Sequence, residues 1–109
     1  MENFRLKQGG RHVSILVLLE GQVKPDKIAD MKSYLAQILP DTRRYDGCQG
    51  IDVQFNLDDP GNMVLVEQWE SRGHHEKYAQ WRTETGVVDK LVSMLTGPPS
   101  IRYFERVDA

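Results

Sequence analysis

Apolar residues follow two strand-like patterns along the chain. Residues 13–19 form a β-branched-rich apolar run that only Ser14 interrupts, which indicates a strand buried on both faces. Residues 51–57 alternate between apolar and polar positions, the period of a half-buried strand. Because residues 58–62 read Asp-Asp-Pro-Gly-Asn, a strong turn signal, we expect residues 63–70 to return as the antiparallel partner. A last short strand is predicted over 101–104.

A helical pattern separates the first two strands. Pro25 suits the first turn of a helix, and the apolar residues after it recur at steps of three and four. This stripe, which should face the sheet, comprises Ile28, Met31, Leu35 and Ile38. Pro40 predicts a kink or a fresh helical turn over 41–45, and Gly47 fits a left-handed helix exit.

Two further helical segments follow the predicted hairpin. Ser71 is a good N-cap for a helix that includes residues 74–85 and ends near Gly86. The apolar positions within 87–95 suit another short helix, which Gly97 and the two prolines after it close. The predicted order is therefore β-α-β-β-α-(α)-β.

This order predicts an α+β fold, the ferredoxin-like βαββαβ arrangement with an antiparallel four-stranded sheet. Such a sheet keeps its helices on one face and leaves the other bare. Since the run 13–19 is apolar on both faces, we expect the bare face to meet a second copy of the chain. The expected assembly is a homodimer through the sheet face, a dimeric α/β barrel.

Length and composition narrow the class of protein. With 109 residues the chain holds one domain, which we place at 12–106, between an N-terminal arm over 1–11 and a tail over 107–109. The net charge of -2 and the lack of a dense basic stretch argue against a nucleic-acid partner. No apolar run approaches the roughly 20 residues of a membrane helix, so we expect no membrane partner. A single cysteine, Cys48, fits a reducing compartment, and we expect the protein to be cytoplasmic.

Aromatic and titratable side chains gather where the predicted strand 63–70 meets the following helix. Trp69 ends the strand, and it either packs in the core or lines a cleft for a flat molecule. A helical spacing places four residues on one face, namely His74, Tyr78, Trp81 and Thr85. An aromatic stripe is often simple core, but imidazole and phenol groups also transfer protons.

Two residues beside this stripe, His75 and Arg82, have roles that the helical spacing alone does not assign. His74 and His75 are adjacent and point about 100° apart on a helix, so we expect no metal site. Arg82 can pair with a carboxylate at the surface or with an anionic oxygen of a substrate.

Five short motifs lie in register with the predicted elements: Val23-Lys24-Pro25, Thr42-Arg43, Gly47-Cys48, Asp59-Pro60 and Glu67-Gln68-Trp69-Glu70-Ser71. Together they resemble the antibiotic biosynthesis monooxygenase (ABM) domain family, small dimeric α/β-barrel proteins, over roughly residues 12–106. The resemblance implies several activities. Some members oxidise polycyclic phenols or hydroquinones with dioxygen and no metal, flavin or other cofactor. Others bind and degrade haem, and many are binding or signalling modules.

The haem-degrading relatives use an Asn on the first strand, a Trp ending the third and a His in the second helix. Trp69 matches the Trp, whereas residues 12–20 contain no Asn. His74 and His75 also lie nearer the start of the helix than that family's ligand, which weakens the haem interpretation.

The interpretation we favour is an oxygenase that needs no cofactor and acts on a phenol or hydroquinone. In this hypothesis His74 or His75 is the base, and Tyr78 or Arg82 steadies the phenolate oxygen. Trp69 and Trp81 would stack on the small aromatic substrate. The alternatives are a ligand-binding or dimeric regulatory module without chemistry, and a haem-binding protein.

Overall fold

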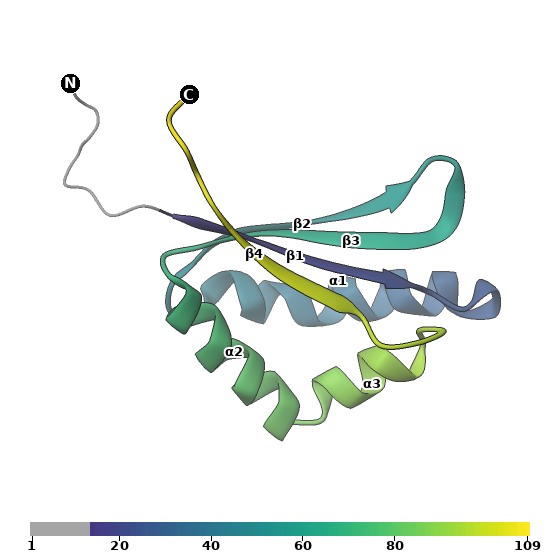
Figure 1. Ribbon diagram of the computed structural model, residues 1–109. Helices are drawn as coiled ribbons and strands as arrows, with labels where there is room; N and C mark the ends of the chain where they lie inside the picture. The colour runs from purple at the N-terminus through teal and green to yellow at the C-terminus, as the bar shows by residue number, and fades with distance from the viewer. Residues whose placement is uncertain (1–13) are drawn as a thin grey trace.

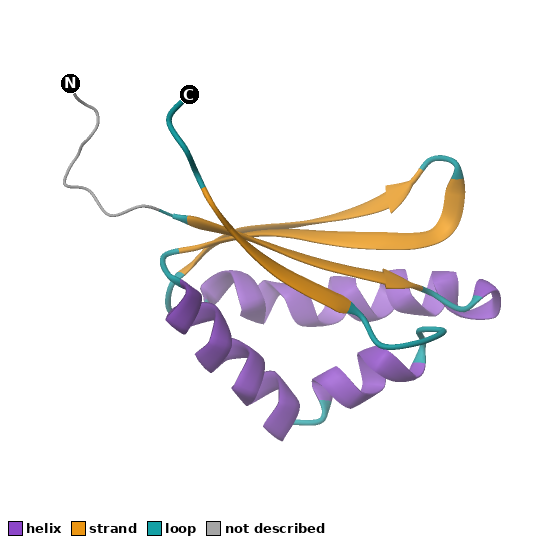
Figure 2. Ribbon diagram, viewed as in Figure 1, coloured by secondary structure: helices purple, strands orange, loops and turns teal. Residues whose placement is uncertain are grey.

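In the described part of the chain, four antiparallel strands form one sheet and the helices lie on one side of it (Figures 1 and 2). The structure is a computed structural model that describes residues 14–109. Its elements are β1 (Ile15–Gln22), the 3₁₀ turn η1 (Pro25–Lys27), α1 (Ile28–Arg44), β2 (Cys48–Asn56), β3 (Asp59–Trp69), α2 (Arg72–Glu84), α3 (Val87–Ser93) and β4 (Ser100–Glu105). The strand order in the sheet is β2-β3-β1-β4. The predicted ferredoxin-like α+β fold is confirmed, while the predicted arm over 1–11 lies outside the described residues.

The strands and turns follow the hydrophobic patterns with small shifts. β2 and β3 pair as the predicted hairpin, although β3 begins at Asp59, four residues earlier than expected. The Ser71 hydroxyl caps α2 by accepting a bond from the His74 backbone N–H at 3.1 Å. Gly47 and Gly86 adopt the left-handed backbone that their positions predicted, with φ of 88° and 83°.

Pro40 does not interrupt α1, which continues as one helix to Arg44. A proline inside a helix costs one backbone hydrogen bond. Here Leu39 and Thr42 are buried on the two sides of Pro40, and an Arg82 guanidinium nitrogen donates to the Ile38 carbonyl at 2.7 Å. These contacts with the rest of the fold hold the last turn of the helix in place.

Two clusters of apolar side chains fill the space between the sheet and the helices. The larger cluster lies under α1 and α3 and consists of Val23, Met31, Tyr34, Leu35, Leu39, Ile51, Met63, Leu65, Leu91, Met94 and Leu95. The smaller one has Val17, Trp69 and Tyr78 at its centre. The candidate chemistry lies around this second cluster.

The face of the sheet away from the helices has an apolar centre. Leu18 on β1 pairs with Val66 on β3 and with Arg102 on β4, and these three side chains share that face. Leu16 and Phe104 pair on the same face. No described helix covers these half-exposed residues (Figure 2).

Candidate active site

A row of paired positions on the inward face of the sheet places two polar side chains near each other. Glu67 on β3 pairs with Val17 on β1, and Val17 pairs with Tyr103 on β4. Glu67 and Tyr103 therefore point toward the helices with one strand between them. α2 contributes His75, which contacts both of them.

Glu67, Trp69, His75 and Tyr103 form what we name the proton network. The Trp69 indole Nε1 donates to Glu67 Oε1 at 2.9 Å, and His75 Nε2 lies 3.7 Å from the same oxygen. On the other side of the ring, His75 Nδ1 is 2.7 Å from the Tyr103 hydroxyl. Trp69 is 0% exposed and Glu67 is 2% exposed, whereas Tyr103 is half-buried. The network thus runs from the core to the surface.

Burial shifts the pKa values of the acid and the base in opposite directions. It raises the pKa of Glu67 to about 7, against the smaller lowering effect of the Trp69 hydrogen bond. It lowers the pKa of His75 to about 4, against a small raising effect of the Glu76 charge. Near neutral pH, His75 is therefore uncharged and Glu67 changes its protonation state.

The hydrogen bonds of the network follow from these charge states. A neutral imidazole carries one N–H and one lone pair, and an ionised carboxylate only accepts. When Glu67 is ionised, the tautomer that fits has the Nε2–H of His75 facing Glu67 and its Nδ1 accepting from the Tyr103 hydroxyl. In this arrangement a proton given to Tyr103 from outside can be passed inward through His75.

A second set of polar contacts, the arginine network, joins α2 to α1. Arg82 Nε donates to the Tyr78 hydroxyl at 2.9 Å, and Arg82 Nη2 donates to Thr42 Oγ1 at 3.0 Å. The Tyr78 and Thr42 hydroxyl oxygens are themselves 2.5 Å apart and share a hydrogen bond in which either hydroxyl can donate. Arg82 is only 6% exposed and forms no ion pair with a described carboxylate.

Aromatic rings lie between and beside the two networks. Tyr78 contacts Trp69, with ring centroids 5.0 Å apart. Trp81 is half-buried and stacks on Tyr45 with centroids 5.2 Å apart and planes inclined by 24°. The guanidinium carbon of Arg82 lies 4.4 Å from the Trp81 ring centroid, within cation–π distance.

His74 belongs to neither network. Its Nδ1 lies 2.6 Å from the Ser71 hydroxyl, and its Nε2 is 3.9 Å from the exposed carboxylate of Asp46. The ring also lies directly against Gly47, where a Cβ would be 2.6 Å from the His74 Cβ and nearer still to the ring. His74 therefore closes the start of α2 onto the α1–β2 turn.

The structure brings together most of the residues that the sequence indicated, but with α2 rotated from the predicted orientation. The buried side of α2 carries His75, Tyr78 and Arg82, whereas Thr85 is exposed. Arg82 is buried, so the surface ion pair considered for it is not formed. Sequence reasoning missed Glu67, although its position on the inward face of β3, two residues before Trp69, marks it as a buried acid.

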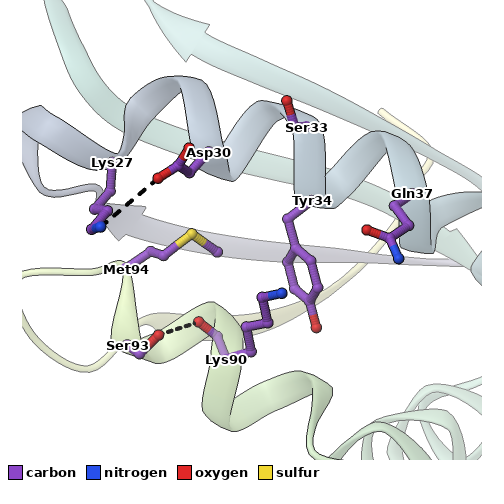
Figure 3. A pocket seen from close by; sticks show the side chains of 8 residues that line it. All are labelled: Lys27, Asp30, Ser33, Tyr34, Gln37, Lys90, Ser93 and Met94. Atoms are coloured by element: carbon purple, nitrogen blue, oxygen red, sulfur yellow. Dashed lines mark hydrogen bonds and ion pairs between the residues drawn. The ribbon is translucent and has the colours of Figure 1, made fainter.

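An open groove of about 420 Å³ lies elsewhere in the described part of the chain, between α1 and α3 (Figure 3). Its walls carry Lys27, Asp30, Ser33, Tyr34, Gln37, Lys90, Ser93 and Met94. Lys27 and Asp30 form an ion pair at 3.8 Å, and Lys90 lies over the Tyr34 ring. Neither the proton network nor the arginine network reaches this groove, so we do not place the chemistry there.

Two classes of feature are missing from residues 14–109. They contain no group of three or more His, Cys, Asp or Glu side chains that could hold a metal ion. None of the helices in this part of the chain is long and apolar enough to cross a membrane.

The fold and the site define an α+β protein with a buried acid–imidazole–phenol network. The family model described as antibiotic biosynthesis monooxygenase matches residues 14–84, and the chain belongs to this ABM family. No curated protein matches the chain.

Solved structures share the fold at low sequence identity. A conserved protein from Methanosarcina mazei matches with a TM-score of 0.80 and 20% identity, covering 87% of this chain and 94% of its own. The Mycobacterium tuberculosis protein Rv0793 matches with a TM-score of 0.76 and 22% identity, covering 88% and 97%. A protein named antibiotic biosynthesis monooxygenase matches with a TM-score of 0.78 and 19% identity, covering 86% and 99%.

Proposed function

We propose that this protein is a monooxygenase that oxidises a phenol or hydroquinone with dioxygen and without a metal or organic cofactor. Membership of the ABM family supports the reaction class. The observation that carries the proposal is the hydrogen bond between the half-buried Tyr103 hydroxyl and the buried, neutral His75. It provides a base that is protected from water yet connected to the surface.

The reaction begins with removal of a proton, because a phenolate gives an electron to dioxygen more readily than a phenol does. The substrate hydroxyl donates to Tyr103 as Tyr103 donates to His75 Nδ1. The resulting radical pair combines to a ring hydroperoxide, which loses water. For a hydroquinone the balance is hydroquinone plus dioxygen giving hydroxyquinone plus water, so no external reductant is required.

We place the reacting substrate oxygen at the edge of the sheet beside β4. Arg72 lies with its guanidinium carbon 4.3 Å from the Tyr103 ring centroid and is paired with Glu76 at 3.2 Å, so the two charges beside the ring offset each other. Trp81 keeps a half-exposed ring against which a flat molecule can stack.

In this proposal the buried residues Trp69, Tyr78 and Arg82 do not contact the substrate. Trp69 contacts no solvent, and it acts by donating to Glu67. Arg82 donates to the Tyr78 hydroxyl, to Thr42 and to the Ile38 carbonyl, and Tyr78 shares a hydrogen bond with Thr42. Tyr78 and Arg82 thereby hold α2 in the position that brings His75 within hydrogen-bonding distance of Tyr103.

We also propose that the active form is a homodimer in which the open faces of two sheets meet. The half-exposed apolar side chains of Leu16, Leu18, Val64, Val66 and Phe104 support this assembly. A second copy would remove these side chains from water, which favours association in proportion to the buried area.

The test is oxygen uptake by chelator-treated protein with a panel of hydroquinones and polycyclic phenols, corrected for autoxidation. Uptake should fall at least about a hundredfold in His75→Gln, the range lost with a general base. Lys77→Gln, an exposed change on the same helix, is the control and should retain the wild-type rate. An equal loss in His74→Gln would contradict the choice of His75. No uptake with any substrate would favour a ligand-binding or regulatory module.

A further inference from the structure

We infer that Glu67 is the positioning residue that takes up a proton when the substrate is deprotonated, at the inner end of a proton relay through Tyr103 and His75. This inference rests on the proposed function and names the inner end of its proton path. It concerns a residue that contacts no substrate and acts only through His75.

The position of Glu67 in the core is the first argument. The neighbouring inward positions of β3, Met63, Leu65 and Trp69, are all buried hydrophobic residues. An isolated carboxylate in such surroundings is strongly disfavoured unless it is paired or takes up a proton. Among residues 14–109, the basic group within 4 Å of the carboxylate is His75.

The connection to His75 is the second argument. Oε1 of Glu67 already accepts from Trp69, which holds the carboxylate in one orientation. His75 Nε2 lies 3.7 Å from that same oxygen, so the ring must move by about half an ångström to form a hydrogen bond. The other ring nitrogen of His75, Nδ1, is hydrogen-bonded to the Tyr103 hydroxyl. The three groups can therefore exchange protons in series.

The surroundings of the carboxylate favour a neutral acid. The titratable groups that face it from the neighbouring elements are Cys48 on β2, His75 and Tyr78 on α2, and Tyr103 on β4. None of these groups carries a positive charge at neutral pH, because burial lowers the pKa of His75 and the others are acids. The proton can remain on Glu67 without leaving a charge in the core.

The transfer conserves every proton. The substrate hydroxyl gives its proton to Tyr103, Tyr103 gives its own to His75 Nδ1, and His75 gives the Nε2 proton to Glu67. The substrate ends as a phenolate, Glu67 as a carboxylic acid, and the two residues between them are unchanged in charge. The proton returns by the same path when water leaves the hydroperoxide.

The first experiment follows the Trp69 indole N–H by NMR between pH 5 and 9. The chain has two tryptophans, so a Trp81→Phe variant assigns the signals. In the wild type the Trp69 signal should shift with a midpoint near neutrality, because its acceptor changes charge. The shift should vanish in Glu67→Gln, which keeps an acceptor oxygen, and persist in Glu70→Gln, an exposed change directly after the same strand. A Trp69 signal that stays constant in the wild type would overturn the inference.

The second experiment mixes the protein with a nitrophenol without dioxygen and records whether the bound phenol is ionised. Wild type and Glu70→Gln should ionise it, and Glu67→Gln should bind it as the neutral phenol. Ionisation unchanged in Glu67→Gln would refute the role of Glu67 even if oxygen uptake is observed. Conversely, Glu67-dependent ionisation without oxygen uptake would support this inference and reject the monooxygenase.

Discussion

At the scale of single residues, Glu67 and His75 contribute to the pH dependence of stability with opposite signs. The pKa of Glu67 rises from 4.5 to about 7 on folding, so the folded state holds an extra proton in that interval and loses stability as the pH rises through it. The pKa of His75 falls from 6.5 to about 4, so the folded state gains stability as the pH rises from 4 to 6.5. The two effects oppose each other over most of the acidic range.

Replacing Glu67 by Gln should separate these contributions. The variant cannot ionise, so relative to the wild type it should gain stability as the pH rises from about 4.5 to about 7. A pKa shift of this size corresponds to a difference in the free energy of unfolding between variant and wild type of about 3 kcal/mol at pH 8 and close to zero at pH 4. Urea unfolding of both proteins at several pH values measures the difference. A difference that does not change with pH would contradict the burial-driven shift.

The hydroxyl of Thr42 should be a further sensitive group, because it is fully buried, accepts from Arg82 and shares a hydrogen bond with the Tyr78 hydroxyl. Thr42→Val keeps the shape but removes the acceptor, which should cost about 2 kcal/mol or more. Thr42→Ser keeps the hydroxyl and should cost about 1 kcal/mol for the lost methyl group. Chemical unfolding compares the two, and an equal loss would show that the hydrogen bonds contribute nothing.

The choice between His74 and His75 could not be made from the sequence for a physical reason. Adjacent residues on a helix point about 100° apart, so the orientation of a helix is read from its apolar side. α2 buries His75, Tyr78 and Arg82, all of which carry polar groups, and its hydrophobic side is therefore poorly marked. The side chains that contact His75 but not His74 lie on β3 and β4, and the sequence of α2 gives no information about them.

At the scale of secondary structure, most elements were predictable because local signals agreed with tertiary packing. The Ser71 cap and the left-handed glycines at positions 47 and 86 are examples. The continuation of α1 through Pro40 could not be predicted, because the contact that stabilises it is made by Arg82. This residue donates to the Ile38 carbonyl and lies 44 positions from Ile38 along the chain. Contacts of this kind leave no trace in local sequence.

The contact between the α1–β2 turn and the start of α2 gives a prediction at this scale. Gly47→Ala would place a Cβ in overlap with His74 and also in a left-handed backbone conformation. Gly86→Ala has the same backbone conformation but nothing within 4 Å of the new Cβ. We expect Gly86→Ala to cost about 1 kcal/mol and Gly47→Ala to cost clearly more in thermal unfolding. Equal costs would mean that His74 moves aside freely.

At the scale of the whole molecule, the two faces of the sheet differ in what covers them. The helix-facing side is filled by the core and the networks, and the sequence pattern of alternating residues in β2 predicted this arrangement. The opposite side presents apolar residues that the described helices leave uncovered. The continuous apolar run of β1 follows from this difference, because its side chains serve both faces.

The proposed dimer can be tested by placing a charge in the middle of the open face. Leu18 pairs with Val66 and Arg102 at the centre of the sheet, so a lysine there would have to be buried without an acid opposite it in either described strand. Leu18→Lys should weaken association by more than about a hundredfold. Sedimentation velocity over a range of concentrations measures this.

The matched control is Leu57→Lys, which makes the same chemical change at a turn residue that is 100% exposed. It should sediment as the wild type does. Both variants should keep the wild-type circular dichroism, because neither side chain faces the helices and the core is unaltered. If Leu18→Lys remains as dimeric as Leu57→Lys, the open face is not the interface. If the wild type is itself a monomer at high concentration, the apolar face must be covered in some other way, and the chemistry must then be complete within one chain.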